Sequence, residues 1–174
     1  MEQIIQLNSQ AKLSEHLASP SEAALGHSNK LDGSHLSPNF TLGELTRSAS
    51  HPEVYNIPSH EAIANLKRVC VWLEELRKRY NQPIIINSGY RSPQLNRAIG
   101  GVATSNHLTG CAVDICVSGL EQLIVYAAIL LDISRDWQQD FDELLIEKNR
   151  YGAVWLHFAV RAKDNRRKIL FINA

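Results

Sequence analysis

The sequence has no excess of charge of either sign. Its 174 residues contain 18 Lys plus Arg and 18 Asp plus Glu, so the formal net charge at pH 7 is zero. Nucleic-acid-binding domains usually carry a basic excess or a basic stripe, and we therefore expect no nucleic-acid partner. A basic cluster at residues 161–168, near the C-terminus, is interpreted as a solvated hairpin or tail.

Long apolar runs are also missing. No stretch approaches the roughly 20 apolar residues that a membrane-spanning helix needs, so we expect no membrane insertion. Residues 1–7 have neither a basic segment nor a long apolar segment, and no secretory signal is expected. These absences predict a protein that is cytoplasmic when it is synthesised.

Cysteine is scarce and irregularly spaced. The chain has three cysteines, Cys70, Cys111 and Cys116, without the CxxC spacing of a metal site. In a reducing compartment they are most simply free thiols. Cys111 and Cys116 would pair only with suitable local geometry, and we expect no disulfide between them.

The sequence divides near residue 37. Residues 1–37 are rich in Ser, Asn, His and Gly, and we interpret them as a leader or a loosely packed N-terminal segment. Residues 38–174 form the domain, and the apolar content of 44% is enough for a single core. The sequence does not specify an oligomeric state, and we favour a monomer.

Helix signals come first in the domain and strand signals later. Thr41, Ser59 and Ser92 are predicted to be the N-caps of three helices, and a fourth helix is expected over 119–131. Short β-branched or apolar runs predict strands at 84–86, 112–117, 142–147, 154–160 and 168–172. This order predicts an α+β fold, an antiparallel sheet with flanking helices.

The stretch Ser105 to Asp114, SNHLTGCAVD, contains two candidate metal ligands. His107 arrives from a loop, Gly110 permits a tight bend, and Asp114 follows on a predicted strand. His157, on a later strand, is the third candidate. Zinc binds a few N or O ligands in a tetrahedral array, and three protein ligands leave one position for water. In a chain with seven histidines, two can also lie near an aspartate by chance.

The residues around these candidates resemble a known family. The matching segments are Phe40-Thr41-Leu42-x-Glu44-Leu45, Ser88-Gly89-Tyr90-Arg91-Ser92-Pro93, Asn96-Arg97, Gly100-Gly101, Ser105-x-His107-x-x-Gly110-x-Ala112-x-Asp114 and Trp155-x-His157. Together, over about residues 38–160, they resemble the D-alanyl-D-alanine carboxypeptidase-type zinc peptidases. This family includes VanX-type dipeptidases and phage L-alanyl-D-glutamate endopeptidases, and it shares its fold with the hedgehog signalling domain.

The resemblance implies a zinc site with an arginine beside it. His107, Asp114 and His157 correspond to the family's Zn²⁺ ligands. Arg91 corresponds to the arginine that contacts substrate carbonyl or carboxylate groups and stabilises the oxyanion, a role that suits a guanidinium fork. The alternative for Arg91 is a structural ion pair.

Two further side chains are expected near the substrate. Trp155 shares a strand face with His157, because side chains alternate along a strand, and would form an aromatic wall beside the metal. Ser105 corresponds to a position near the substrate or behind the ligand loop, and its alternative is a simple turn or cap serine. Cys111 lacks an obvious base and is interpreted as a packing residue.

The sequence departs from the family at the catalytic base. Many members carry a glutamate three residues before the last histidine ligand, and here that residue is Val154. The small phage and bacterial branch instead has an acidic residue at the end of the preceding strand, which makes Glu147 the candidate base. Glu147 could instead face solvent at a turn, and Asp142 is expected to have a structural role.

The resemblance predicts a zinc peptidase that cuts peptidoglycan stem peptides, as a D-Ala-D-Ala carboxypeptidase or an L-Ala-D-Glu endopeptidase. Such an enzyme would reach the cell wall by lysis or another route of release. The alternative is a non-catalytic binding or structural module that keeps the fold and the zinc. The absent glutamate at Val154 favours this alternative.

Overall fold

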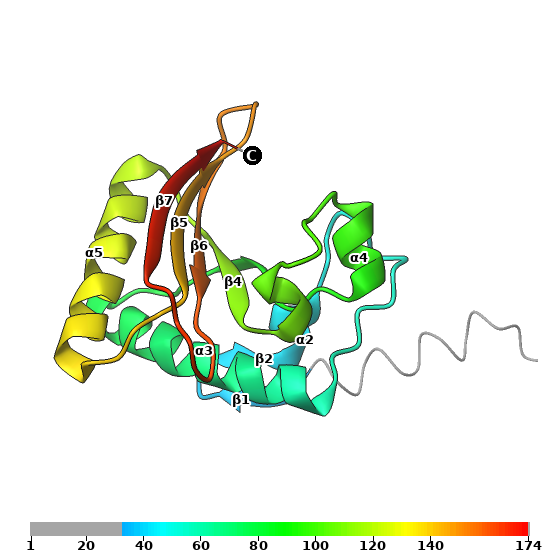
Figure 1. Ribbon diagram of the computed structural model, residues 1–174, viewed down its shortest axis with the longest axis horizontal. Helices are drawn as coiled ribbons and strands as arrows, with labels where there is room; N and C mark the ends of the chain where they lie inside the picture. The colour runs from blue at the N-terminus through cyan, green and yellow to red at the C-terminus, as the bar shows by residue number, and fades with distance from the viewer. Residues whose placement is uncertain (1–32, 174) are drawn as a thin grey trace, which may run out of the picture.

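A five-stranded sheet forms the centre of the computed structural model, which describes residues 33–173 (Figure 1). Its strands lie in the order β3-β4-β6-β5-β7. Their bounds are Ile86–Ser88 for β3, Ala112–Cys116 for β4, Glu143–Lys148 for β5, Val154–Ala159 for β6 and Lys168–Asn173 for β7. The chain is therefore an α+β protein, as its sequence predicts.

The sheet is antiparallel except at one edge. The pairs β3–β4, β4–β6 and β5–β6 are antiparallel, whereas β5–β7 is parallel. The antiparallel sheet expected from the sequence is present in three of the four pairs, and the parallel pair β5–β7 was not predicted. The chain reverses after β6, but β4 and β5 already occupy both edges of β6. The returning strand β7 therefore pairs with the free edge of β5 and runs parallel to it.

Within residues 33–173, four α-helices and one 3-10 helix surround the sheet. They are α2 (Leu42–Thr46), α3 (His60–Tyr80), α4 (Pro93–Ala98), the 3-10 helix η1 (Asn106–Thr109) and α5 (Leu120–Trp137). The predicted N-caps are confirmed: the side chains of Thr41, Ser59 and Ser92 each accept a hydrogen bond from the backbone N–H three residues on. These bonds satisfy N–H groups that have no partner inside the helix.

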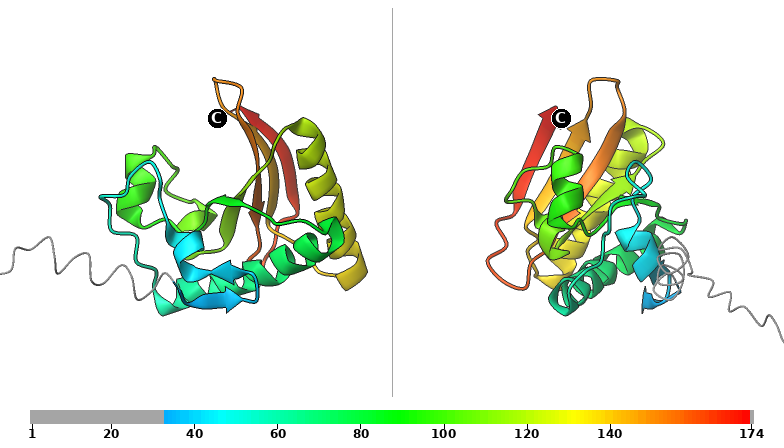
Figure 2. Two further views of the ribbon diagram at one scale, coloured as in Figure 1. Left: turned by 180° about the vertical axis from the view of Figure 1, so that it is seen from behind. Right: turned by 90° about the vertical axis from the view of Figure 1, so that its right-hand side faces the viewer.

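The main core lies between the sheet and the helices α3 and α5. Trp72 of α3 packs against Trp137 of α5 and Phe158 of β6, with ring centroids 5.1 and 5.3 Å apart. On β4, Val113 and Ile115 point into this core. Neighbouring side chains on a strand point to opposite faces, so the residues between and beside them belong to the other face. That face looks toward α4 (Figure 2).

The N-terminal segment predicted over residues 1–37 falls almost entirely outside the described residues. Its last residues are structured, because β1 (His35–Ser37) pairs with β2 (Phe40–Thr41) in a separate two-stranded sheet. The expectation of free thiols is confirmed for Cys70, Cys111 and Cys116. Among the helices that the structure describes, none has the length and apolar character required to span a bilayer.

Candidate metal centre

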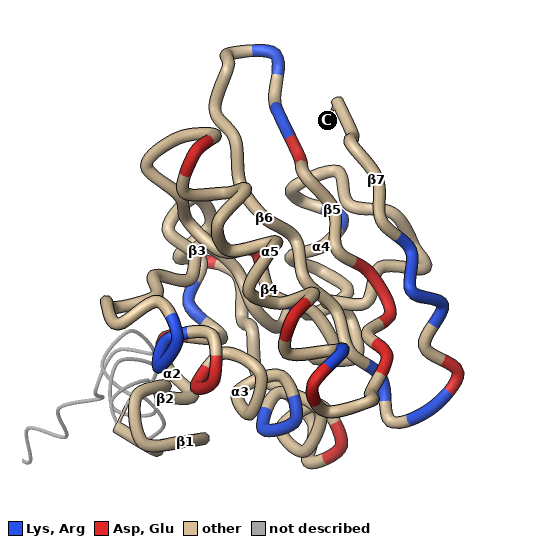
Figure 3. Tube along the Cα trace, turned by 90° about the vertical axis from the view of Figure 1, so that its left-hand side faces the viewer, with Lys and Arg blue, Asp and Glu red and all other residues tan. Residues whose placement is uncertain are grey.

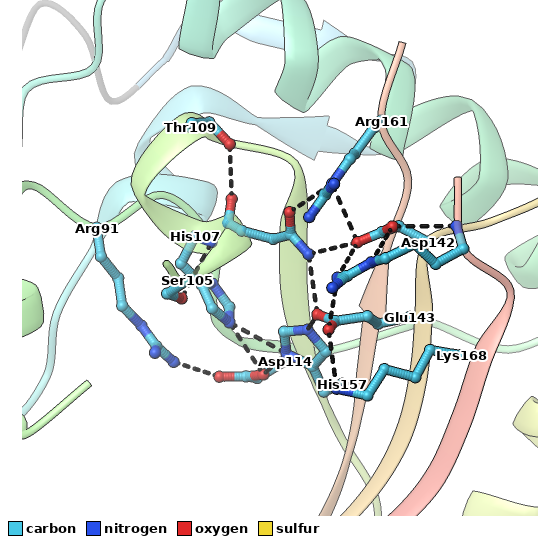
Figure 4. Close-up of polar contacts among 12 residues, drawn as sticks. Arg91, Ser105, His107, Thr109, Asp114, Asp142, Glu143, His157, Arg161 and Lys168 are labelled. Carbon is cyan, nitrogen blue, oxygen red and sulfur yellow. Dashed lines mark hydrogen bonds and ion pairs between the residues drawn. The ribbon is translucent and has the colours of Figure 1, made fainter. Parts of the chain in front are cut away.

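The structure brings His107, Asp114 and His157 together on the face of the sheet that is turned away from α5 (Figure 4). Asp114 of β4 pairs directly with His157 of β6, and η1 places His107 beside them. One ligand atom from each residue lies within 4.8 Å of the other two. The three residues are buried, with exposed fractions of 2%, 6% and 6%.

Local sequence around η1 determines where His107 lies. The Ser105 hydroxyl accepts a hydrogen bond from the His107 backbone N–H at 3.3 Å, so Ser105 acts as the cap of η1. Gly110 ends η1 in the left-handed region at φ 72°. A Cβ atom there would lie 2.5 Å from the carbonyl oxygen of Ala62 in α3. Glycine thus allows η1 to sit directly against α3. The substrate contact expected of Ser105 stays a prediction.

The orientation of the side chains suits a divalent metal ion. His157 Nδ1 lies 2.9 Å from Asp114 Oδ1, and His107 Nε2 lies 3.2 Å from each of these atoms. On the far side of its ring, His107 Nδ1 lies 2.6 Å from the carbonyl oxygen of Gly89. A carbonyl only accepts, so Nδ1 carries the proton and the Nε2 lone pair faces the other two ligands. Two histidines and one carboxylate are a donor set that zinc takes.

The ionisation of the three residues is strongly coupled. Burial alone would raise the pKa of Asp114, but the two histidines lower it well below its usual range. Burial lowers the pKa of His107. Burial acts the same way on His157, but the contacts of its ring with the carboxylates of Asp114 and Glu143 outweigh it and raise the pKa to about 9. The centre therefore holds a negative carboxylate in a buried position, which favours a bound cation.

Arg91 forms an ion pair with one of these ligands. Its Nη2 group donates to Asp114 Oδ2, and its Nε donates to Ser88 Oγ at 2.9 Å. The structural ion pair that the sequence left as an alternative is therefore present. Nη1 forms no hydrogen bond to any of the residues described here, so part of the guanidinium is left over for an oxygen of another molecule.

Glu147 and Trp155 lie on the same face of the sheet as the ligands. Leu145 of β5 pairs with His157, and Glu147 pairs with Trp155, one step along the same face. Burial and the negative charge of Asp114 raise the pKa of Glu147. Glu147 is thus partly buried beside the centre rather than fully exposed at a turn. Its role as base and that of Trp155 at the substrate stay predictions. Val154 packs against the core instead.

Glu143 and Asn106 contact the centre and were not singled out from the sequence. Glu143 Oε2 lies 3.4 Å from His157 Nε2 and 2.9 Å from Asn106 Nδ2. Asn106 Nδ2 also donates to Asp142 Oδ2 at 2.8 Å. The signal for Glu143 was its spacing, because it is two and four residues from Leu145 and Glu147 and so shares their face.

Asp142 is fully buried and has the structural role that its position predicts. Arg166 donates to it from Nε at 2.8 Å and from Nη2 at 2.6 Å, and Arg161 Nε lies 3.1 Å away. Burial alone would raise the pKa of Asp142, but these partners and Asn106 lower it. The basic cluster is therefore not simply a solvated tail, because two of its arginines neutralise a buried carboxylate.

Two comparisons with known proteins relate the chain to a family of peptidases. Residues 38–140 match the family model described as Peptidase M15. Over 79 residues the chain is 35% identical to the zinc D-Ala-D-Ala carboxypeptidase of Streptomyces albus G, a stretch that covers 44% of this chain and 31% of that relative. The chain thus matches under a third of the relative's length. The family match includes Arg91, His107 and Asp114 but ends before Glu147 and His157.

Proposed function

Because the chain belongs to the peptidase M15 family, we propose that it is a zinc-dependent peptidase that hydrolyses peptide bonds in peptidoglycan stem peptides. The observation that carries this proposal is the meeting of His107, Asp114 and His157, whose ligand atoms lie within 4.8 Å of one another. These three residues would hold the metal. Zinc in such a site lowers the pKa of a bound water and polarises a carbonyl group.

Glu147 and Arg91 would supply the groups that a hydrolysis needs beside the metal. Glu147 would take the proton of the attacking water and pass it to the leaving amine. The raised pKa of this carboxyl suits a group that must both accept and donate a proton near neutral pH. Arg91 would place its Nη1 donors on the oxygen that becomes negative in the transition state.

The substrate class follows from the relative named above, which acts on D-Ala-D-Ala as a carboxypeptidase. We propose a stem peptide with D-amino acids, cut at D-Ala-D-Ala or at L-Ala-D-Glu. Trp155 and Ser105 would contact this peptide, and the pairing of Trp155 with Glu147 supports this role for Trp155. A cell-wall substrate requires that the enzyme reach the wall by lysis or another release.

The test is hydrolysis of defined peptides by the purified, zinc-loaded protein. One peptide ends in D-Ala-D-Ala, another contains the L-Ala-D-Glu bond, and products are identified by mass spectrometry. We expect one peptide to be cut by the wild type and by Glu121→Ala, a change on the surface of α5, but not by His107→Ala or Glu147→Ala. A zinc-loaded wild type that cuts neither peptide would instead support the non-catalytic module.

A further inference from the structure

One atom of the metal centre has no regular hydrogen-bond partner. His157 turns Nδ1 toward Asp114 and His107 and turns Nε2 away from them. Nε2 is buried, and within residues 33–173 no group forms a regular hydrogen bond to it. Its closest charged neighbour is Glu143, whose Oε2 lies 3.4 Å away.

The chemistry of imidazole says what this atom needs. A neutral histidine that binds a metal through Nδ1 carries its proton on Nε2. Metal-bound histidines almost always donate that second N–H to a carboxylate, a carbonyl or a water. His107 already meets this condition through the Gly89 carbonyl. For His157, the carboxylate of Glu143 lies in the position of this acceptor.

Glu143 is itself held firmly. Its Oε2 accepts from Asn106 Nδ2 at 2.9 Å, and its Oε1 accepts from Arg166 Nη2 at 2.8 Å. Lys168 Nζ lies 3.6 Å from the same Oε1. The side chain is only 13% exposed. It is therefore a fixed carboxylate pointed at the ring of His157 rather than a mobile surface group (Figure 4).

We propose that Glu143 is the positioning residue of the metal centre, the carboxylate that receives the Nε2 proton of His157 and so presents Nδ1 to the metal. This rests on the proposed metal site. Glu143 does not bind the metal itself, because its carboxylate lies beyond the ring of His157, on the side away from Asp114 and His107.

Asn106 extends this role to the second histidine. It precedes His107 in η1, and its amide joins Glu143 to the buried Asp142 at 2.9 and 2.8 Å. Arg166 contacts the same two carboxylates. One polar network thus fixes both Glu143, which faces His157, and the segment η1, which carries His107. The basic cluster at residues 161–168 supplies the positive charges of this network.

The test measures zinc affinity, which does not depend on peptidase activity. Zinc is titrated into the metal-free protein against a chromogenic chelator, for the wild type, Glu143→Ala and Glu143→Gln. Glu143→Ala is expected to weaken zinc binding roughly 10- to 100-fold. Glu143→Gln is expected to stay within a few-fold of the wild type, because its amide oxygen still accepts a proton. Nitrogen NMR of the zinc-loaded wild type is expected to show His157 protonated at Nε2.

A matched control separates positioning from a general loss of stability. Glu74 also accepts hydrogen bonds, from Ser37 and Asn39, on α3 and away from the centre. Glu74→Ala is expected to keep wild-type zinc affinity. The proposal would be overturned if Glu143→Ala bound zinc as tightly as the wild type. It would also be overturned if Glu143→Gln or Glu74→Ala lost as much zinc affinity as Glu143→Ala. His107→Ala tests the site itself: unchanged zinc binding there would overturn the site and this role together.

Discussion

Each residue of the metal centre is supported on the side turned away from the other two. His107 is held by the Gly89 carbonyl, Asp114 by Arg91, and His157 faces Glu143. Side chains that are already oriented lose little conformational freedom when a metal binds. The centre is thus built before the metal arrives, and single changes in the supporting residues are expected to act through geometry.

Gly110 offers a test of how closely η1 packs against α3. Gly110→Ala places a methyl group against the Ala62 carbonyl at a positive φ, and we expect a loss of roughly 2–4 kcal/mol in unfolding free energy together with weaker zinc binding. Gly100→Ala is the matched control, because Gly100 has a similar φ of 76° but nothing within 4 Å. It should lose only about 1 kcal/mol. Urea unfolding measures both, and equal losses would contradict the close contact.

Asp142 predicts an acid limit to stability. The pKa of its carboxyl is lower in the folded protein than its usual value of 3.8, so the unfolded chain binds the proton more readily. Its contribution is fully present above pH 3.8 and is lost as the pH falls through the folded pKa. Asp142→Asn should lower the unfolding free energy of the metal-free protein by roughly 1–3 kcal/mol at pH 6 and flatten its decline in acid.

The measurement is urea unfolding of the metal-free protein at several pH values between 6 and about 3. Asp132→Asn is the control, because Asp132 is half exposed and pairs with Arg135 on the surface of α5. That change should stay within about 0.5 kcal/mol of the wild type. An Asp142→Asn variant whose stability falls as steeply in acid as the wild type would refute the assignment.

At the scale of helices and strands, local signals were reliable where they act within a few residues. The N-caps at Thr41, Ser59 and Ser92 were predicted because a cap depends on one side chain and a nearby N–H. The end of α5 was not predicted: the helix was expected to stop at 131 but continues to Trp137. Its last turns are stabilised by packing on α3, which no local pattern encodes.

That extension can be tested through its aromatic contact. Trp137→Ala removes the edge-to-face contact with Trp72, whose ring centroid is 5.1 Å away. We expect the unfolding free energy to fall by about 2 kcal/mol and the helical signal of circular dichroism to decrease slightly. Ile124→Ala, an exposed change on the same helix, should stay within about 0.5 kcal/mol. If Trp137→Ala were as stable as Ile124→Ala, the contact between Trp137 and Trp72 would contribute nothing to the unfolding free energy.

At the scale of the molecule, the sequence predicted the three candidate ligands that the structure brings together, but not the residues that surround them. His107, Asp114 and His157 belong to motifs that a single sequence displays. The contact between Glu143 and Arg166 could not be predicted, because it depends on β7 lying beside β5, and that parallel pairing arises from the whole sheet. Asp142 was predicted only as a structural residue, without its partners.

Zinc is expected to stabilise the folded protein as a whole. A ligand that binds only the folded state adds about 2.7 kcal/mol at a free concentration 100 times its dissociation constant. For a domain of this size, this corresponds to roughly 5–10 °C in the midpoint of thermal unfolding. Scanning calorimetry with and without a chelator measures the shift. His107→Ala should show no shift, and a wild type insensitive to the chelator would argue against a native zinc site.

The direct pairing of Asp114 with His157 across β4 and β6 also bears on how the molecule folds. A slip of one residue in this pairing would turn one of the two side chains to the opposite face, so the donor set exists only after these strands have found their partners. The pairing joins positions 43 residues apart, and such distant contacts form late. Zinc should therefore stabilise the folded state but not the transition state of folding. It should slow unfolding and leave the refolding rate unchanged.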